Sequence, residues 1–125
     1  MDPNGVSAEI VDAAMQVHSA TGPGLLESTY QACLAHELRE RGLTVRTQVP
    51  LPVVYKAIEL PVGYRVDLMV EETIIVEIKT VASVLPIHHA QLLTYLRLSH
   101  RRLGLLLNFN VVHMRHGIKR LVNKL

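Results

Sequence analysis

The sequence has few of the residues that cross-link or anchor small proteins. Its 125 residues include one cysteine, Cys33, no tryptophan and one phenylalanine. A single cysteine excludes an internal disulfide, and its position beside Leu34 in a helical pattern favours a small buried side chain over a nucleophile. No uncharged apolar run approaches the roughly 18 residues of a membrane span. The opening segment, MDPNGVSAE, lacks a basic flank and an apolar signal region, so we expect a cytoplasmic protein with no membrane partner.

Charged residues are also scarce. They make up 19% of the chain, whereas about a quarter is usual in globular domains. Hydrophobic residues reach 49%, with a mean hydropathy of +0.23. A chain of this length forms one domain, over residues 1–125, and can bury a core. Its apolar excess predicts a homo-oligomer, and a dimer, a ring or a large closed assembly would each hide apolar surface.

The small net charge of +2 hides an uneven distribution. Residues 1–42 carry a net charge of −4, and residues 100–125 carry +6 without a single acid. A basic C-terminal segment is a candidate contact for a phosphate backbone. The alternatives are a solvated face, or a match to the acidic half of another subunit. The candidate nucleic-acid-binding residues are Arg101, Arg102, Arg115, Lys119, Arg120 and Lys124.

Hydrophobic periodicity predicts an α/β (α+β) domain with helices packed on a mixed sheet of four or five strands. The expected helices begin after a Ser7 cap, run from about Leu25 to Arg41, and run from His88 or His89 to about Ser99. The expected strands lie at 43–49, 53–56, two within Tyr64–Thr80, Leu103–Asn108 and a last pair around His116-Gly117, with a turn at Glu59–Gly63. Pro50 and Pro52 interrupt the first of them and indicate an edge or bent strand. A helix between the fourth strand and Leu103–Asn108 predicts a parallel crossover.

The predicted hairpin at Tyr64–Thr80 carries Asp67, Glu77 and Lys79. Glu77 and Lys79 share a face, because strand side chains alternate. A three-residue loop at Glu71-Glu72-Thr73 would set Asp67 directly across from Glu77, whereas a two-residue loop would turn it to the other face. Three-residue loops often have glycine at their last position, where this chain has Thr73. We predict the three-residue loop from the chemistry it permits.

That chemistry is the binding of a hard divalent cation. Two carboxylates across a strand pair suit Mg²⁺ or Mn²⁺, and the Ile78 carbonyl could add a third ligand. Lys79 could orient an attacking water or neutralise charge growing on a phosphate. The other interpretation of Asp67, Glu77 and Lys79 is an ordinary solvated sheet face with a cross-strand salt bridge.

Two further sets of polar residues allow more than one interpretation. Glu27 borders the buried stripe of its helix, either as a partner of the helix dipole or as a residue directed at a site. His88 and His89 could cap the third helix. His113 and His116 have a spacing that could bind a transition metal, although no cysteine or third histidine accompanies them nearby.

The order of elements and motifs resembles the PD-(D/E)xK nuclease superfamily. More narrowly, it resembles the GxxExxY family of small bacterial proteins, whose motif stands here as Gly24-Leu25-Leu26-Glu27-Ser28-Thr29-Tyr30. The resemblance continues through YRVDL, the Val76–Lys79 segment, HHAQLLTYLRL, GLLLNF and the end from Gly117 to Arg120. One departure is Val66, which replaces the proline before the motif aspartate.

The resemblance implies a role for each matching residue. Asp67 and Glu77 would bind Mg²⁺ or a similar ion, and Lys79 would assist the attacking water. Glu27 would complete the metal site, and Gln91 would support it from the following helix. The implied function is a metal-dependent nuclease-like protein that binds DNA or RNA, with DNA expected first, and can hydrolyse its phosphodiester bonds.

Two other functions remain open at this level. One is a catalytically silent, self-assembling nucleic-acid-binding protein of the same fold. The other is a partner-binding module whose carboxylates are structural. Fold-level analogy does not choose between them.

Overall fold

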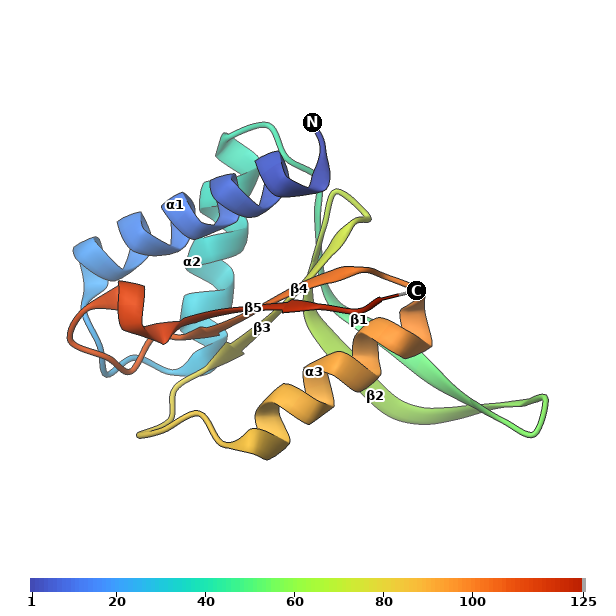
Figure 1. Ribbon diagram of the computed structural model, residues 1–125. Coiled ribbons are helices and arrows are strands. Elements are labelled where there is room, and N and C mark those ends of the chain that lie inside the picture. The colour runs from blue at the N-terminus through green and yellow to red at the C-terminus, as the bar shows by residue number, and fades with distance from the viewer. Residues whose placement is uncertain (125) are drawn as a thin grey trace.

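A computed structural model describes residues 1–124 as a five-stranded sheet with helices on both faces (Figure 1). The strands follow chain order across the sheet, and β3 runs parallel to β4 while the other neighbours are antiparallel. This confirms the predicted mixed sheet and its crossover. The elements are α1 (Pro3–Thr21), α2 (Glu27–Glu40), β1 (Val45–Tyr55), β2 (Ile58–Val70), β3 (Ile74–Lys79), α3 (Pro86–Ser99), β4 (Leu103–Asn108), η1 (Met114–Gly117) and β5 (Ile118–Val122).

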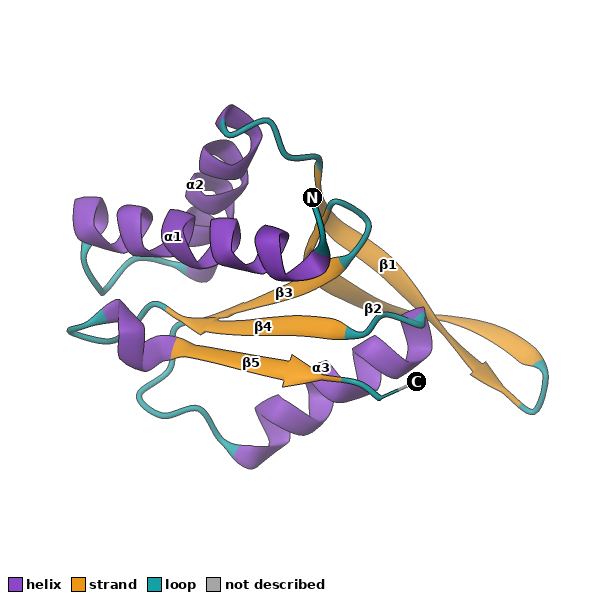
Figure 2. Cartoon of the chain, turned by 45° about the horizontal axis from the view of Figure 1, so that its top comes forward, coloured by secondary structure: helices purple, strands orange, loops and turns teal. Residues whose placement is uncertain are grey.

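The core has one layer on each side of the sheet. Apolar residues of α1 and α2 pack with the even-numbered residues of β3, and those of α3 pack on the opposite face around Ile75 and Leu106. Figure 2 shows α3 apart from α1 and α2, across the sheet. Because β4 is covered on both faces, every residue of Leu103–Asn108 is buried. Among residues 1–124, no helix is long and apolar enough to cross a membrane.

Two helix starts differ from the prediction. The first helix begins at Pro3, where the Asp2 side chain accepts a hydrogen bond from the Gly5 amide at 2.8 Å, and Ser7 is buried inside the helix. Aspartate followed by proline is a strong start signal, which explains why it takes precedence over Ser7. The third helix begins at Pro86, and His88 caps it by accepting from the Leu85 amide at 3.0 Å.

The predicted edge position of the first strand is confirmed, whereas the predicted break after it and the turn at Glu59–Gly63 are wrong. β1 and β2 form one long hairpin whose turn is Lys56-Ala57, with φ of 50° and 65°. β1 lies at the edge of the sheet, where prolines remove no required hydrogen bond. The far end of this hairpin projects beyond the rest of the molecule (Figure 1). The predicted last strand pair is also a single strand, β5, preceded by the short helix η1.

Tertiary contacts hold the unusual loop between β2 and β3. Glu71 and Glu72 both adopt positive φ, 54° and 51°, which is unfavourable for residues with a side chain. The Glu71 carboxylate accepts from the Thr44 amide at 2.8 Å, and Arg46 binds Glu72 through two nitrogens at 2.6 and 2.7 Å. These hydrogen bonds stabilise a backbone conformation that glycine would adopt without strain.

Candidate active site

The register of the β2–β3 hairpin brings the two central carboxylates together. Val70 pairs with Ile74, so the loop between the strands has the predicted three residues. Continuing that register places Asp67 across from Glu77, as the sequence predicted.

The two strands separate at this point, and the carboxylates fill the opening. Backbone pairing extends to Leu68 and Val76. Beyond it, the Ile78 amide donates to Asp67 Oδ2 at 2.8 Å, and the Asp67 amide donates to Glu77 Oε1 at 3.3 Å. Each carboxylate thus satisfies a main-chain N–H that the neighbouring strand has left without a partner. The site is built where the sheet opens.

Burial changes the acidity of Glu77. Its side chain is only 7% exposed. Burial, together with the negative charge of the adjacent Asp67, raises the pKa of Glu77 to about 9, and the positive charge of Lys79 opposes the shift. Two adjacent carboxylates in a poorly solvated place hold a proton between them unless a cation takes its place.

This donor set fits a hard divalent cation. Mg²⁺ is commonly held by one or two carboxylates together with waters. A residue's N–H and C=O point to the same side of a strand, so the Ile78 carbonyl also faces the opening beside Asp67. Within residues 1–124, no group of three or more histidine, cysteine, aspartate and glutamate side chains is close enough to hold a metal ion. The site therefore has two carboxylates, Asp67 and Glu77.

Glu27 lies at the start of α2 and contacts the end of the third strand. Its Oε1 accepts a hydrogen bond from the Thr80 amide at 3.2 Å. Thr80 directly follows Lys79, so Glu27 fixes the backbone next to the lysine. The structure does not bring Glu27 into a metal-binding cluster with Asp67 and Glu77.

Tyr30 holds the turn that precedes Glu27. Its hydroxyl donates to the Gly22 carbonyl and accepts from the Leu25 amide at 3.2 Å. Its fully buried ring stacks on Phe109 with centroids 4.4 Å apart. The glutamate and tyrosine of the sequence motif thus act as one unit, because Tyr30 positions the turn from which Glu27 projects.

Sequence reasoning missed two glutamines at the site. Gln48 Nε2 donates to Asp67 Oδ1 at 3.2 Å and to Gln31 Oε1 at 2.6 Å. Gln48 has a φ of 50° in the middle of a strand, a conformation that non-glycine residues rarely adopt outside functional or constrained sites. Gln31 follows Glu27 by four residues and shares its helix face, a spacing that could have identified it.

Lys79 and Gln91 lie on the α3 side of the site. Both line a cavity of about 620 Å³ together with Tyr64 and Tyr95. Burial raises the pKa of Tyr95, the charge of Glu77 adds to the shift, and the Gln91 side chain opposes it. Gln91 lies one helical turn before Tyr95 on α3, so both side chains belong to the wall of this cavity.

The basic residues near the C-terminus do not form one stripe. Arg101 lies 3.8 Å from Glu72, and Arg120 donates to Asn4 at 2.9 Å. Lys119 and Arg120 are neighbours on the edge strand β5, so they point to opposite faces of the sheet.

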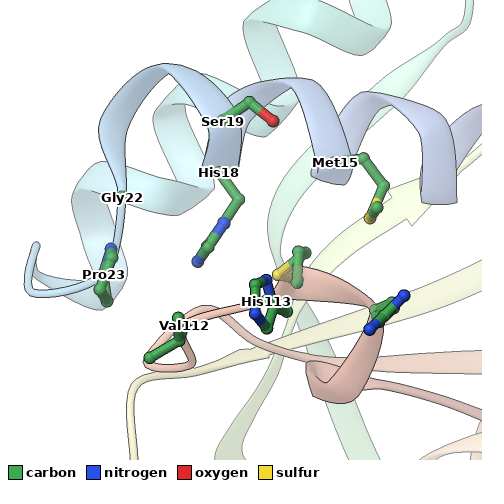
Figure 3. A pocket seen from close by; sticks show the side chains of 9 residues that line it. Met15, His18, Ser19, Gly22, Pro23, Val112 and His113 are labelled. Carbon is green, nitrogen blue, oxygen red and sulfur yellow. The ribbon is translucent and has the colours of Figure 1, made fainter.

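Two histidines, His18 and His113, line a second cavity of about 510 Å³, between the end of α1 and η1 (Figure 3). His18 forms a 2.7 Å hydrogen bond with the Val111 carbonyl oxygen. The rings of His113 and His116 meet edge to face with centroids 5.9 Å apart. No third ligand joins them among the residues that the structure describes, so they do not form a metal site of the predicted kind.

The fold and site together define a class of protein. A mixed sheet with a helical crossover, and an aspartate opposed to a Glu-x-Lys where two strands separate, is a nuclease-like architecture. The sequence model described as the PD-(D/E)XK nuclease superfamily matches residues 4–121, and the chain belongs to this superfamily. No curated protein and no solved structure matches the chain.

Proposed function

We propose that this protein binds nucleic acid and hydrolyses phosphodiester bonds in it with the help of Mg²⁺ or Mn²⁺. The observation that carries the proposal is the pair Asp67 and Glu77, held face to face where β2 and β3 separate. The raised pKa of the buried Glu77, about 9, supports this proposal, because strongly shifted carboxyl groups cluster at functional sites. DNA is the nucleic acid we would test first.

Each residue of the site would have a separate role. Asp67, Glu77 and the Ile78 carbonyl would hold the cation, which supplies positive charge beside the phosphate and lowers the pKa of a bound water. Lys79 would place its ammonium group near the attacked phosphate and stabilise the charge that develops there. Glu27 would fix the backbone after Lys79, and Gln91 would orient Tyr95.

We also propose that the chain belongs to the GxxExxY group within the superfamily. The contacts of the motif support this assignment. Tyr30 binds the Gly22 carbonyl and the Leu25 amide, and Glu27 binds the Thr80 amide, so the motif links the first turn of α2 to the end of β3.

A gel assay on purified protein tests the hydrolysis. Single- and double-stranded DNA and RNA would be incubated with Mg²⁺, with Mn²⁺ and with a chelator. We expect metal-dependent cleavage that falls by roughly 100-fold or more in Lys79→Ala and is lost in Asp67→Ala. Lys56→Ala is the matched control, because Lys56 lies at the far turn of the β1–β2 hairpin. Cleavage that persists in Asp67→Ala would contradict the proposal.

A second candidate function is supported by the exposed apolar residues of that hairpin. Val54, Tyr55 and Ile58 are 60%, 61% and 61% exposed on an arm that projects from the molecule (Figure 1). Such a surface suits a homo-oligomer, up to a large closed assembly, that binds nucleic acid without cutting it. Analytical ultracentrifugation tests it. A monomer at micromolar concentration, or cleavage in the gel assay, would count against this candidate.

A further inference from the structure

The cavity beside Lys79 has an unusual combination of walls. Its volume is about 620 Å³, within the range of small-molecule sites. One side is formed by Val53 and Tyr64 of the β1–β2 hairpin, and the other by residues of α3, including Ile87 and Gln91. Figure 1 shows α3 lying alongside β2. The cavity is therefore a mainly apolar space whose lining includes one lysine, Lys79.

Two tyrosines give this cavity an aromatic wall. The rings of Tyr64 and Tyr95 have centroids 6.2 Å apart and are inclined by 56°. Tyr95 is 7% exposed and belongs to the core, whereas Tyr64 is 47% exposed and keeps an accessible ring. Ile87 on α3 is 67% exposed. An exposed ring and an exposed isoleucine across one cavity suit a flat apolar ligand between them.

The cavity adjoins the candidate active site at two residues. Lys79 lines the cavity and lies two positions from Glu77 on the same face of β3. Tyr95 lines the cavity and feels the charge of Glu77. A nucleotide whose phosphate lies beside Lys79 would therefore have its base within reach of Tyr64.

We infer that this cavity receives an unpaired nucleobase stacked on Tyr64, so that the substrate class is single-stranded nucleic acid. This inference rests on the proposed function and adds its specificity. A base in a duplex is stacked and paired, and it would have to be flipped out at a cost of a few kcal/mol before it could enter. An unpaired base avoids this cost, and stacking on an aromatic side chain accepts any base. The amide of Gln91 offers a donor and an acceptor to the edge of the base.

The test is a binding measurement in chelator, where metal-dependent cleavage cannot occur. Fluorescence anisotropy would compare a short single strand, an abasic strand with the same number of phosphates, and a hairpin duplex. We expect Tyr64→Ala to weaken binding of the base-containing strand by roughly 5- to 150-fold and to leave the abasic strand unchanged. Tyr64→Phe, which keeps the ring, should bind like the wild type. The same strands made of RNA show which sugar the site prefers.

Two controls keep the result interpretable. Thermal unfolding of Tyr64→Ala shows whether the variant is folded, and Ile87→Ala removes the opposite wall at a position that is 67% exposed. Ile87→Ala should also weaken only the base-containing strand. Equal losses on both strands, a duplex bound as tightly as the single strand, or no binding of any strand would overturn the inference.

The two proposals can fail separately. Metal-dependent cleavage of duplex that is indifferent to Tyr64→Ala would keep the nuclease and remove the base site. Base-dependent binding of a single strand without cleavage in any metal would keep the base site and remove the hydrolysis.

Discussion

At the scale of single residues, Glu77 has the charge state that depends most on the fold. Its carboxyl titrates near 4.5 when unperturbed and at about 9 in the folded protein. Between these values the folded chain binds a proton that the unfolded chain has released. Stability therefore falls as pH rises across this window, by about 1.4 kcal/mol per pH unit. The stability that the protonated Glu77 carboxyl contributes is fully present below pH 4.5 and fully lost above about pH 9.

The fall in stability with rising pH gives the first prediction. In chelator, the free energy of unfolding of the wild type should decrease relative to Glu77→Gln between about pH 5 and pH 9. The neutral amide cannot ionise, so the variant lacks this dependence and becomes the more stable protein toward pH 9. Urea unfolding at three pH values measures the difference. Parallel pH profiles for the two proteins would contradict the prediction.

The same proton gives a second prediction about metal affinity. A divalent cation binds the ionised pair, so binding must release the proton held at Glu77. Affinity for Mn²⁺ should rise about tenfold per pH unit between about pH 5 and pH 9. Calorimetry in buffers of different ionisation enthalpy counts the protons released. A pH-independent affinity in the wild type, or equal affinity in Glu77→Gln, would show that Glu77 is not a ligand.

At the scale of elements, the turn before α2 depends on one hydroxyl. Tyr30→Phe keeps the ring stacked on Phe109 but leaves the Gly22 carbonyl and the Leu25 amide without their partner. We predict a loss of about 1–3 kcal/mol in the free energy of unfolding, measured in urea, together with slower cleavage because the turn positions Glu27. Tyr55→Phe is the control, since Tyr55 is 61% exposed. Equal stability of the two variants would contradict this account.

Much of this arrangement of elements could be predicted from local sequence. The run LGLLLN predicts a strand covered on both faces, and β4 is fully buried. The helix between Lys79 and Leu103 predicts the parallel crossover, which the β3–β4 pairing confirms. Within the site, alternation and a three-residue loop suffice to place Asp67 opposite Glu77.

The features that local sequence does not predict depend on pairing between distant segments. Pro50 and Pro52 predict an edge strand, which β1 is, but only the pairing of β1 with β2 shows that the hairpin continues past the prolines and Gly63. Gln48 reaches Asp67 because β1 pairs with β2 in one particular register, and its positive φ is invisible in the sequence. The contact between Gln48 and Asp67 thus follows from tertiary structure, whereas the position of Glu77 can be predicted from its motif.

At the scale of the whole molecule, charge is distributed across several surfaces. The net charge of +6 over residues 100–125 contrasts with −4 over residues 1–42. Part of this positive charge is engaged within the chain, because Arg101 lies near Glu72 and Arg120 binds Asn4. Lys119 and Lys124 are exposed and lie outside the ion pairs of the described residues.

This distribution predicts how nucleic-acid affinity responds to salt. The logarithm of the affinity should fall linearly with the logarithm of salt concentration, and each lost phosphate contact should reduce the slope by about 0.7 for a single strand. Lys119→Ala should reduce the slope by that amount without changing the preference for an unpaired base. Anisotropy titrations over a series of salt concentrations measure it. An unchanged slope in Lys119→Ala combined with Lys124→Ala would exclude this edge as a phosphate contact.

The opening between β2 and β3 has a spectroscopic consequence. The amide protons of Asp67 and Ile78 are bonded to carboxylates, whereas most strand amides are bonded to main-chain carbonyls. Their NMR resonances should therefore follow ionisation and cation binding at the site while the amides of the paired ladder stay fixed. Two nuclei would thus report the occupancy of the site from inside the sheet, without a substrate and without an added label on the ligand.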